Sequence, residues 1–223
     1  MLIALPLVLI AAPFGNEGGN FIYKVCKHWA STWYFFVGIR HQELHEAPHD
    51  KTKQYIFVAN HISYLDIPPI VVTLRQPIRV LGKQEMVNIP IFGWIYKSAV
   101  VLVDRSSPQK RAESVMALKA ALKNGISVFI FPEGMFNQTK MPLKDFYDGA
   151  FRIAIEMQTP IKPMLFVDTR SRLPQKGLFE LTPGPSRVVC LAEVSVEGLG
   201  VQDLPALKQR VFDIMNAGLL RYG

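Results

Sequence analysis

The chain has 223 residues, of which 49% are hydrophobic and only 19% are charged. This balance excludes an intrinsically disordered protein and supplies enough apolar side chains for the core of one full-sized domain. The two cysteines, Cys26 and Cys190, lie far apart and match no zinc-ligand spacing, so neither a disulfide framework nor a metal site is expected. This cysteine usage favours a reducing, cytoplasmic setting.

The net charge of +7 is concentrated in one part of the chain. Residues 75–111 contain seven basic side chains and two acidic ones, an excess of five positive charges. The stretch lacks the clustered basic helix or aromatic sheet pattern of nucleic-acid-binding modules, which makes nucleic-acid binding a remote alternative. We therefore expect a lipid phosphate or an anionic membrane lipid as the partner, and the alternative is a simple solvated basic face.

The first 14 residues are apolar throughout, but they are too few to span a bilayer, which takes about 20 residues in a helix. Pro6 and Pro13 also interrupt a regular helix, and no basic residues precede the apolar run as they would in a secretory signal. A turn is expected at residues 15–20, where glycine and asparagine are frequent. A helix is expected to follow it, capped by Asn20 and ending near Gly38.

The helix predicted at residues 20–38 is rich in aromatic side chains. Apolar residues recur at helical spacing along one stripe, which comprises Ile22, Val25, Trp29, Trp33 and Phe36. Lysines and a histidine occupy other positions, a pattern typical of a helix that lies in a membrane interface. The alternative is that the stripe packs on the protein's own core. We expect a membrane-associated segment at residues 1–39 and one domain at residues 40–223.

From about residue 41 onward, short apolar runs alternate with amphipathic stretches, and this pattern indicates an α/β fold. Strands are predicted at residues 54–59, 78–81, 99–103, 126–131, 161–167 and 187–194. Helices are predicted at residues 66–74, 90–97, 108–123, 149–157 and 204–220. The simplest architecture is a mixed, largely parallel sheet covered by helices, with functional groups on loops at the strand ends.

The segment NHISYLD, residues 60–66, directly follows the first predicted strand. The five-residue spacing at a strand-to-helix turn allows Asp66 to bind one imidazole nitrogen of His61 and leaves the other nitrogen able to accept a proton. The alternative is a surface histidine beside an aspartate that merely caps a helix. The sequence has no GxSxG motif, so direct attack by a substrate oxygen is simpler than a covalent acyl-enzyme.

Further segments accompany this motif in a fixed order. They are residues 82–94 with Asp104-Arg105, then FPEG at residues 131–134, then PIKP at residues 160–163. Together with NHISYLD they closely resemble the glycerolipid acyltransferases of the lysophosphatidate acyltransferase family, over residues 54–167. The resemblance implies roles for six residues: general base, His61; orienting carboxylate, Asp66; cationic contacts for phosphate or oxyanion, Lys83 and Arg105; acceptor-positioning groups, Glu133 and Gly134.

The predicted strands place these residues consistently. Lys83 and Arg105 each follow a predicted strand, and the ends of strands are where such sheets collect their ligands. The alternative for Arg105 is a local ion pair with Asp104. The FPEG segment also ends a strand, and its proline and glycine favour a turn that presents Glu133 and a free backbone N–H. The alternative there is an ordinary turn with a solvated glutamate.

The resemblance also implies a reaction and a location. The reaction is transfer of a fatty acyl group from acyl carrier protein or coenzyme A to the free hydroxyl of a lysophospholipid, and lysophosphatidate is the acceptor we expect. No metal or other cofactor and no acyl-enzyme are implied. The expected location is the cytoplasmic face of the inner, or plasma, membrane, where the partners are membrane lipid, the lysophospholipid and the acyl donor.

The chain departs from the family directly after FPEG. The family usually continues with Thr-Arg-Ser, and its arginine is associated with the acceptor phosphate, whereas this chain has Met-Phe-Asn at residues 135–137. Phe136 cannot supply the paired hydrogen bonds of an arginine. We expect Lys83, Arg105 and Lys140 to replace it. The alternative acceptor is a phosphate-free lysolipid, such as an amino-acid-containing lipid.

Other classes of function compete with acyl transfer. A thioesterase or lipase would use water or an enzyme nucleophile in place of the lipid hydroxyl. A non-catalytic membrane-binding protein would use only its aromatic helix. Release of free acid that does not depend on lysolipid would indicate a hydrolase rather than a transferase. A pure membrane-binding protein would keep its cellular role after His61 is replaced by alanine.

Overall fold

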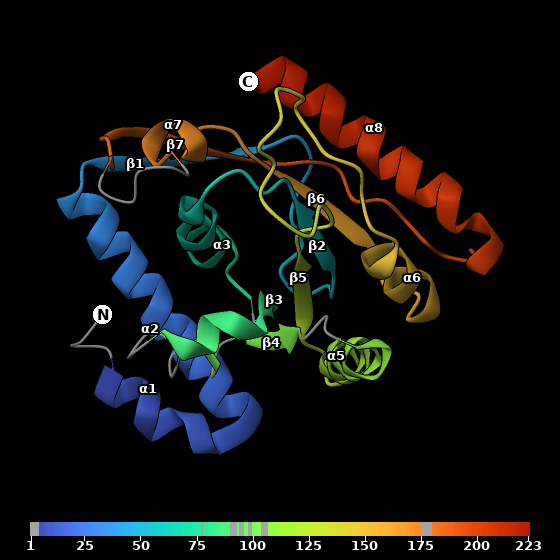
Figure 1. Ribbon diagram of the computed structural model, residues 1–223, viewed down its shortest axis with the longest axis horizontal. Helices are drawn as coiled ribbons and strands as arrows, with labels where there is room; N and C mark the ends of the chain where they lie inside the picture. The colour runs from blue at the N-terminus through green and yellow to red at the C-terminus, as the bar shows by residue number, and fades with distance from the viewer. Residues whose placement is uncertain are drawn as a thin grey trace.

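The computed structural model describes residues 5–76, 78–89, 93, 96–97, 100–103, 107–174 and 180–223. It is an α/β structure built on a seven-stranded sheet with strand order β1-β7-β6-β2-β5-β3-β4 (Figure 1). Neighbouring strands run parallel except β6 and β7, which are antiparallel. The predicted fold class, a mixed and largely parallel sheet covered by helices, is confirmed.

The strands agree closely with the sequence-based prediction. Their bounds are β1 Ile39–His45, β2 Ile56–Ala59, β3 Ile78–Lys83, β4 Val100–Val103, β5 Ser127–Ile130, β6 Ile161–Phe166 and β7 Gly184–Cys190. β7 ends four residues before the predicted limit, and Val194 instead forms an isolated bridge to Ile161. β1 was not predicted, because an edge strand with mostly polar side chains carries no apolar run.

Helices cover both faces of this sheet. Their bounds are α1 Leu5–Ala11, α2 Gly15–Phe36, α3 Ile67–Thr73, α5 Pro108–Lys123, α6 Gly149–Glu156, α7 Thr169–Arg172 and α8 Leu204–Tyr222. Short 3₁₀ turns lie at η1 Ala12–Phe14, η2 Tyr64–Asp66, η3 Gln84–Asn88 and η4 Val201–Asp203. The helix predicted at residues 90–97 falls mostly outside the described residues, as does Ala99 of the strand predicted at residues 99–103.

The turn predicted at residues 15–20 is wrong, because these residues form the first turns of α2. Among residues 15–20, Gly15 alone has a positive φ, of +53°. Inside the helix, a Cβ on Gly18 would lie 1.9 Å from the Ala11 carbonyl oxygen, and a Cβ on Gly19 would lie 2.3 Å from an Arg79 nitrogen. The glycines therefore allow close packing of the helix rather than a chain reversal.

The aromatic helix α2 has two different faces. Ile22, Ala30 and Tyr34 are buried, whereas Phe35 and Phe36 are 80% and 79% exposed. The Tyr23 hydroxyl donates to the carbonyl of Leu74 at the end of α3, which ties the helix to the body of the protein. No helix in the described part of the chain is both long enough and apolar enough to cross a membrane.

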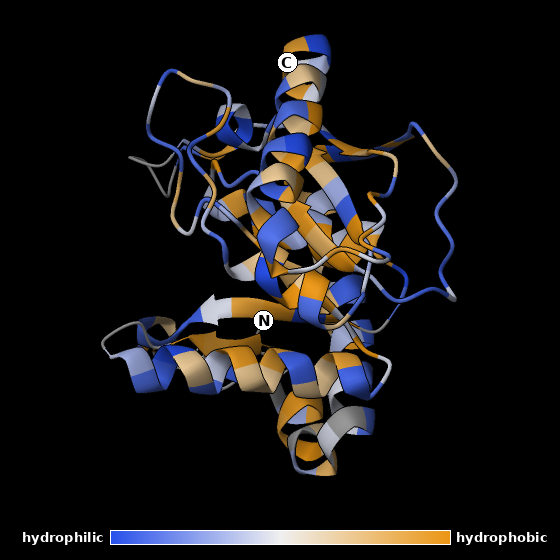
Figure 2. Cartoon of the chain, turned by 90° about the vertical axis from the view of Figure 1, so that its right-hand side faces the viewer, coloured by the Kyte–Doolittle hydropathy of each residue, from blue (hydrophilic) through white to orange (hydrophobic). Residues whose placement is uncertain are grey.

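Alternating side chains of the central strands build a core on each face of the sheet. On one face, Ile56 and Val58 of β2 belong to a cluster with side chains of α5, α6 and α8. On the other face, Phe57 and Ala59 belong to a cluster with Ile70 of α3 and residues of neighbouring strands. Figure 2 shows the strands coloured mainly as hydrophobic and the surrounding helices with mixed colouring, as this arrangement requires.

Asn60 extends the pairing of β2 and β6 beyond the last ladder residues. It is fully buried, its amide nitrogen donates to the Phe166 carbonyl (2.9 Å), and its oxygen accepts from the Phe166 N–H (2.8 Å). Loss of this side chain leaves two buried main-chain groups without their partner. The chain entering the candidate site is thus held to a second strand.

We expect Asn60→Ala to lower the free energy of unfolding by about 2–4 kcal/mol, since each unpaired buried group costs about 1–3 kcal/mol. Denaturant titration measures this loss. The control is Asn124→Ala, which removes an exposed amide bonded to the Ala120 carbonyl (2.9 Å) and should cost much less. Equal losses in the two variants would contradict this role for Asn60.

Candidate active site

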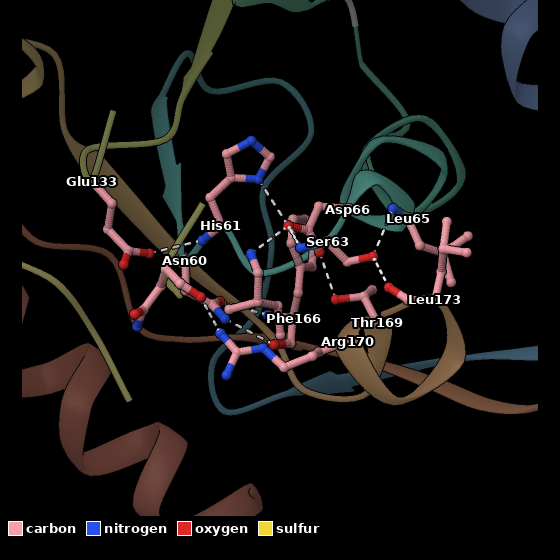
Figure 3. Close-up of polar contacts among 12 residues, drawn as sticks. Asn60, His61, Ser63, Leu65, Asp66, Glu133, Phe166, Thr169, Arg170 and Leu173 are labelled. Carbon is pink, nitrogen blue, oxygen red and sulfur yellow. Dashed lines mark hydrogen bonds and ion pairs between the residues drawn. The ribbon is translucent and has the colours of Figure 1, made fainter. Parts of the chain in front are cut away.

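Neighbouring parallel strands bring distant segments of the sequence together. β2 lies between β5 and β6, and the three strands run parallel, so their carboxyl ends share one edge of the sheet. His61 follows β2, Glu133 follows β5 and Thr169 follows β6. Figure 3 shows these three side chains around one loop at that edge. Such edges are the usual ligand sites of open α/β sheets.

His61 and Asp66 form the central contact of this loop. The Nδ1 atom of His61 lies 2.8 Å from Oδ2 of Asp66. Asp66 is fully buried, and the His61 side chain is 17% exposed. The same carboxylate also closes a capping box with Ser63. Asp66 therefore caps a helical turn and contacts His61 at the same time, as both the alternative and the prediction expected.

The donors around Asp66 keep its charge solvated inside the protein. Oδ2 also accepts from the N–H groups of Ile62 (2.7 Å) and Ser63 (2.9 Å). Oδ1 accepts from the Thr169 hydroxyl (2.5 Å). Main-chain and hydroxyl donors thus reach both oxygens of this carboxylate. It therefore holds Nδ1 of His61 as the protonated nitrogen, which makes Nε2 the proton acceptor.

Aromatic rings flank the His61 imidazole. The Phe131 ring stacks on it with centroids 3.8 Å apart, and the Phe136 ring lies 4.2 Å away at a tilt of 54°. Tyr64 contacts the edge of Phe136 (4.7 Å between centroids). Within the described part of the chain, no hydrogen bond engages Nε2. The arrangement offers one basic nitrogen in largely apolar surroundings.

Glu133 lies behind the histidine loop and not in solvent. Glu133 is only 1% exposed. Its two carboxylate oxygens accept hydrogen bonds from the main-chain N–H groups of His61 (2.8 Å) and Lys144 (2.9 Å). Burial raises the pKa of Glu133 to about 7, against the lowering effect of these hydrogen bonds. The solvated-glutamate alternative is therefore wrong, and Glu133 braces two loops.

The FPEG turn was expected to present a free backbone N–H to a ligand. The N–H of Gly134 does not have this role, because it donates to the Phe131 carbonyl (3.0 Å). The glycine is required for another reason, since its φ of +71° is in the left-handed region. Gly134 thus shapes the turn that carries Phe136 to His61.

None of the predicted cations is seen to contact the histidine site in the described part of the chain. Lys83 ends β3 at the same edge of the sheet, but its side chain is 69% exposed and pairs with Glu85 (3.2 Å). Arg105 lies outside the described residues. Lys140 is exposed. In the described ranges, no group of three or more His, Cys, Asp or Glu side chains is arranged to hold a metal ion.

Two residues of the site were missed by reasoning from the sequence. Thr169 reaches Asp66 from 103 positions further along the chain. Lys144 lines a groove of about 370 Å³ together with Met135, Phe136, Gln138 and Thr139. Neither residue belongs to a recognised motif, but each lies within about ten positions after one, which is where such partners could be sought.

Comparisons with known proteins identify the relatives of this chain. The acyltransferase family model matches residues 38–167. A chloroplastic 1-acyl-sn-glycerol-3-phosphate acyltransferase of Arabidopsis thaliana is 31% identical over 191 residues, which cover 85% of this chain and 52% of the relative. The alpha form of that enzyme from Mus musculus is 31% identical over 183 residues, 79% of this chain and 62% of the relative.

The fold has a solved counterpart. The crystal structure of the 1-acyl-sn-glycerophosphate acyltransferase PlsC from Thermotoga maritima superposes with a TM-score of 0.75 at 20% identity, over 99% of this chain and 90% of that one. This likeness supports the fold. The chain spans about half the length of the plant relative and somewhat more of the mouse relative.

The raised pKa of Glu133 predicts a pH-dependent stability. An acid whose pKa is raised by folding stabilises the protein below its unfolded pKa, here near 4.5, and loses that contribution as the pH rises through about 7. Relative to Glu133→Gln, which cannot ionise, the wild type should lose about 3 kcal/mol of stability across this window. Thermal unfolding of both proteins from pH 4.5 to 8 measures the difference.

The matched control for this pH series is the exposed Glu197→Gln, which should leave the stability difference flat. A flat difference for Glu133→Gln would show that Glu133 ionises in the folded protein as readily as in the unfolded chain.

Proposed function

This chain belongs to the acyltransferase family, and we propose that it transfers a fatty acyl group from a thioester donor to the free hydroxyl of lysophosphatidate. The observation that carries the proposal is the 2.8 Å contact between Nδ1 of His61 and buried Asp66. This contact leaves Nε2 as a base at the ligand-binding edge of the sheet. The donor in this proposal is acyl carrier protein or coenzyme A, and neither metal nor cofactor takes part.

The chemistry needs one proton acceptor and one leaving group. Nε2 of His61 takes the proton of the acceptor hydroxyl while that oxygen attacks the thioester carbonyl carbon. Asp66 stabilises the imidazolium that results. The carbon–sulfur bond then breaks, and the sulfur leaves with the proton returned by His61. The ester forms, and both side chains regain their starting states.

The remaining site residues have supporting parts in this proposal. Lys83 and Arg105 contribute positive charge toward phosphate or the carbonyl oxyanion. Glu133 and Gly134 position the acceptor indirectly, because they shape the loops on either side of His61. Ser63 is not a nucleophile in this scheme, since its hydroxyl donates to the Leu173 carbonyl (2.7 Å) and accepts from Leu65 N–H.

The acceptor phosphate needs a cation in place of the missing family arginine. Phe136 occupies that position and packs on His61. Lys144 lines the same groove as Phe136. Among the cations in the described part of the chain, we propose that the Lys144 ammonium binds the acceptor phosphate. Without such a contact, the same base would serve a phosphate-free lysolipid, which is the alternative acceptor.

We propose that the exposed face of α2 holds the enzyme on the cytoplasmic face of the inner membrane. Phe35 and Phe36 project into solvent, and Phe14 and Phe21 are 67% and 45% exposed along the same segment. Apolar side chains of this size at a surface are stabilised by transfer into lipid. The opposite face packs on the body of the protein, so the segment can serve both roles.

Purified wild type in detergent should acylate lysophosphatidate from one of the two thioester donors. His61→Ala and Asp66→Asn should each lower kcat at least about 100-fold, because a positioned general base contributes roughly 10²–10⁴-fold. KM should stay within about threefold, since neither side chain is assigned to binding. The control His45→Ala removes an exposed histidine of β1 whose described side-chain hydrogen bond joins the Glu43 carboxylate (3.5 Å).

The same assay separates the competing functions. Release of free fatty acid at equal rates with and without lysolipid would indicate a thioesterase. Acylation of a phosphate-free lysolipid but not of lysophosphatidate would overturn the acceptor and leave the chemistry standing. Full activity of His61→Ala would overturn the base.

The double variant Phe35→Ser with Phe36→Ser should bind anionic phospholipid vesicles at least about tenfold more weakly, because two exposed rings lose their transfer into lipid. Vesicle sedimentation measures the bound fraction. Met116→Ser on α5 is the control, since this side chain is 69% exposed on another surface. Unchanged binding of the double variant would contradict the assigned face.

A further inference from the structure

Asp66 is fixed by two elements, only one of which contains the histidine. The contacts to Oδ2 all come from residues 61–63, which lie in the same loop as Asp66. The contact to Oδ1 comes from Thr169, at the start of α7. Figure 3 shows the carboxylate lying between the His61 ring and the Thr169 side chain. The plane of the carboxylate is therefore set from both sides.

Thr169 is itself held rigidly. It is fully buried, and it directly follows Asp168, which binds Arg187 of β7 through paired contacts at 2.8 and 2.7 Å. The main-chain N–H of Arg187 donates to the same aspartate (2.8 Å). The hydroxyl that reaches Asp66 thus comes from a turn anchored on the sheet.

The turn that carries Thr169 contacts the histidine loop at further points. Arg170 donates to the carbonyl of Asn137, whose own N–H donates to the His61 carbonyl (2.7 Å). Ser63 donates its hydroxyl to the carbonyl of Leu173 (2.7 Å). Residues 169–173 therefore support the loop at His61 and directly after it.

We propose that Thr169 is a positioning residue of the acyl transfer, which acts through Asp66 to hold the His61 ring in its reactive orientation. This inference rests on the proposed function. Without the hydroxyl, Oδ1 is a buried charged atom that lacks this donor, and the carboxylate can rotate away from Nδ1. The effect falls on the proton-transfer step, because Thr169 contacts the orienting carboxylate and not the imidazole.

The test uses one variant of nearly the same shape that lacks the hydroxyl and one smaller variant that keeps it. Thr169→Val removes the hydroxyl and should lower kcat about tenfold or more with KM within about twofold, as expected for losing a hydrogen bond to a charged group. Thr169→Ser keeps the hydroxyl and should restore kcat to within about threefold of wild type. Thr182→Val is the control, because that hydroxyl bonds the carbonyl of Ser171 (3.0 Å) in the same turn without touching Asp66.

A double-mutant cycle distinguishes positioning from a general loss of structure. If Thr169 acts through Asp66, then Thr169→Val should reduce kcat less than about twofold in an Asp66→Asn background. A structural role would reduce it by the same factor in both backgrounds and would overturn the proposal. Equal kcat for wild type and Thr169→Val would also overturn it.

A spectroscopic readout is independent of turnover. The Nδ1 proton of His61, identified by its absence in His61→Ala, should give a downfield proton resonance in wild type and Thr169→Ser and a weaker one in Thr169→Val. An unchanged resonance in Thr169→Val would count against the proposal. Wild type that acylates no lysolipid would refute the proposed function alone, since this resonance still reports whether Thr169 holds the pair.

Discussion

The buried charge of Asp66 is the constraint on which the rest of the site depends. An ionised carboxylate removed from water costs several kcal/mol unless protein donors replace its hydration. Those donors come from the loop after β2 and from the turn after β6, which meet because the two strands are parallel neighbours. The pairing register of β2 with β6 is therefore needed to bring these donors to Asp66 as well as to form the sheet.

A second buried carboxylate holds the same loop from behind. Glu133 follows β5 and accepts from the His61 N–H, so the main chain at His61 is fixed by one acid and its ring by another. Phe131 and Phe136 then complete the surroundings of the ring. Residues that follow β2, β5 and β6 thus act together on the loop of a single histidine, which explains how a short loop can hold a base in a defined orientation.

Much of this arrangement could be predicted from the sequence, because strong periodicity and short motifs carry local information. The helix at Pro108–Lys123 was predicted at its observed bounds, and the pairing of His61 with Asp66 was predicted from their spacing together with the family segments that accompany them. β1 could not be found, since only Ile39 and Leu44 of its residues are apolar. Thr169 was missed because its partner is 103 residues away, and no local pattern encodes such a contact.

The boundary of the family match has a consequence for how this protein can be divided. The match ends at residue 167, yet β1 pairs along its whole length with β7, which lies beyond that limit. Thr169, the donor to Oδ1 of Asp66, also lies just beyond it. A fragment cut at the family boundary would carry every recognised motif and would still have an unpaired strand and an incompletely solvated charge. The region matched by the family model is thus shorter than the segment that contains the paired sheet and all donors to Asp66, and grafting experiments need the longer segment.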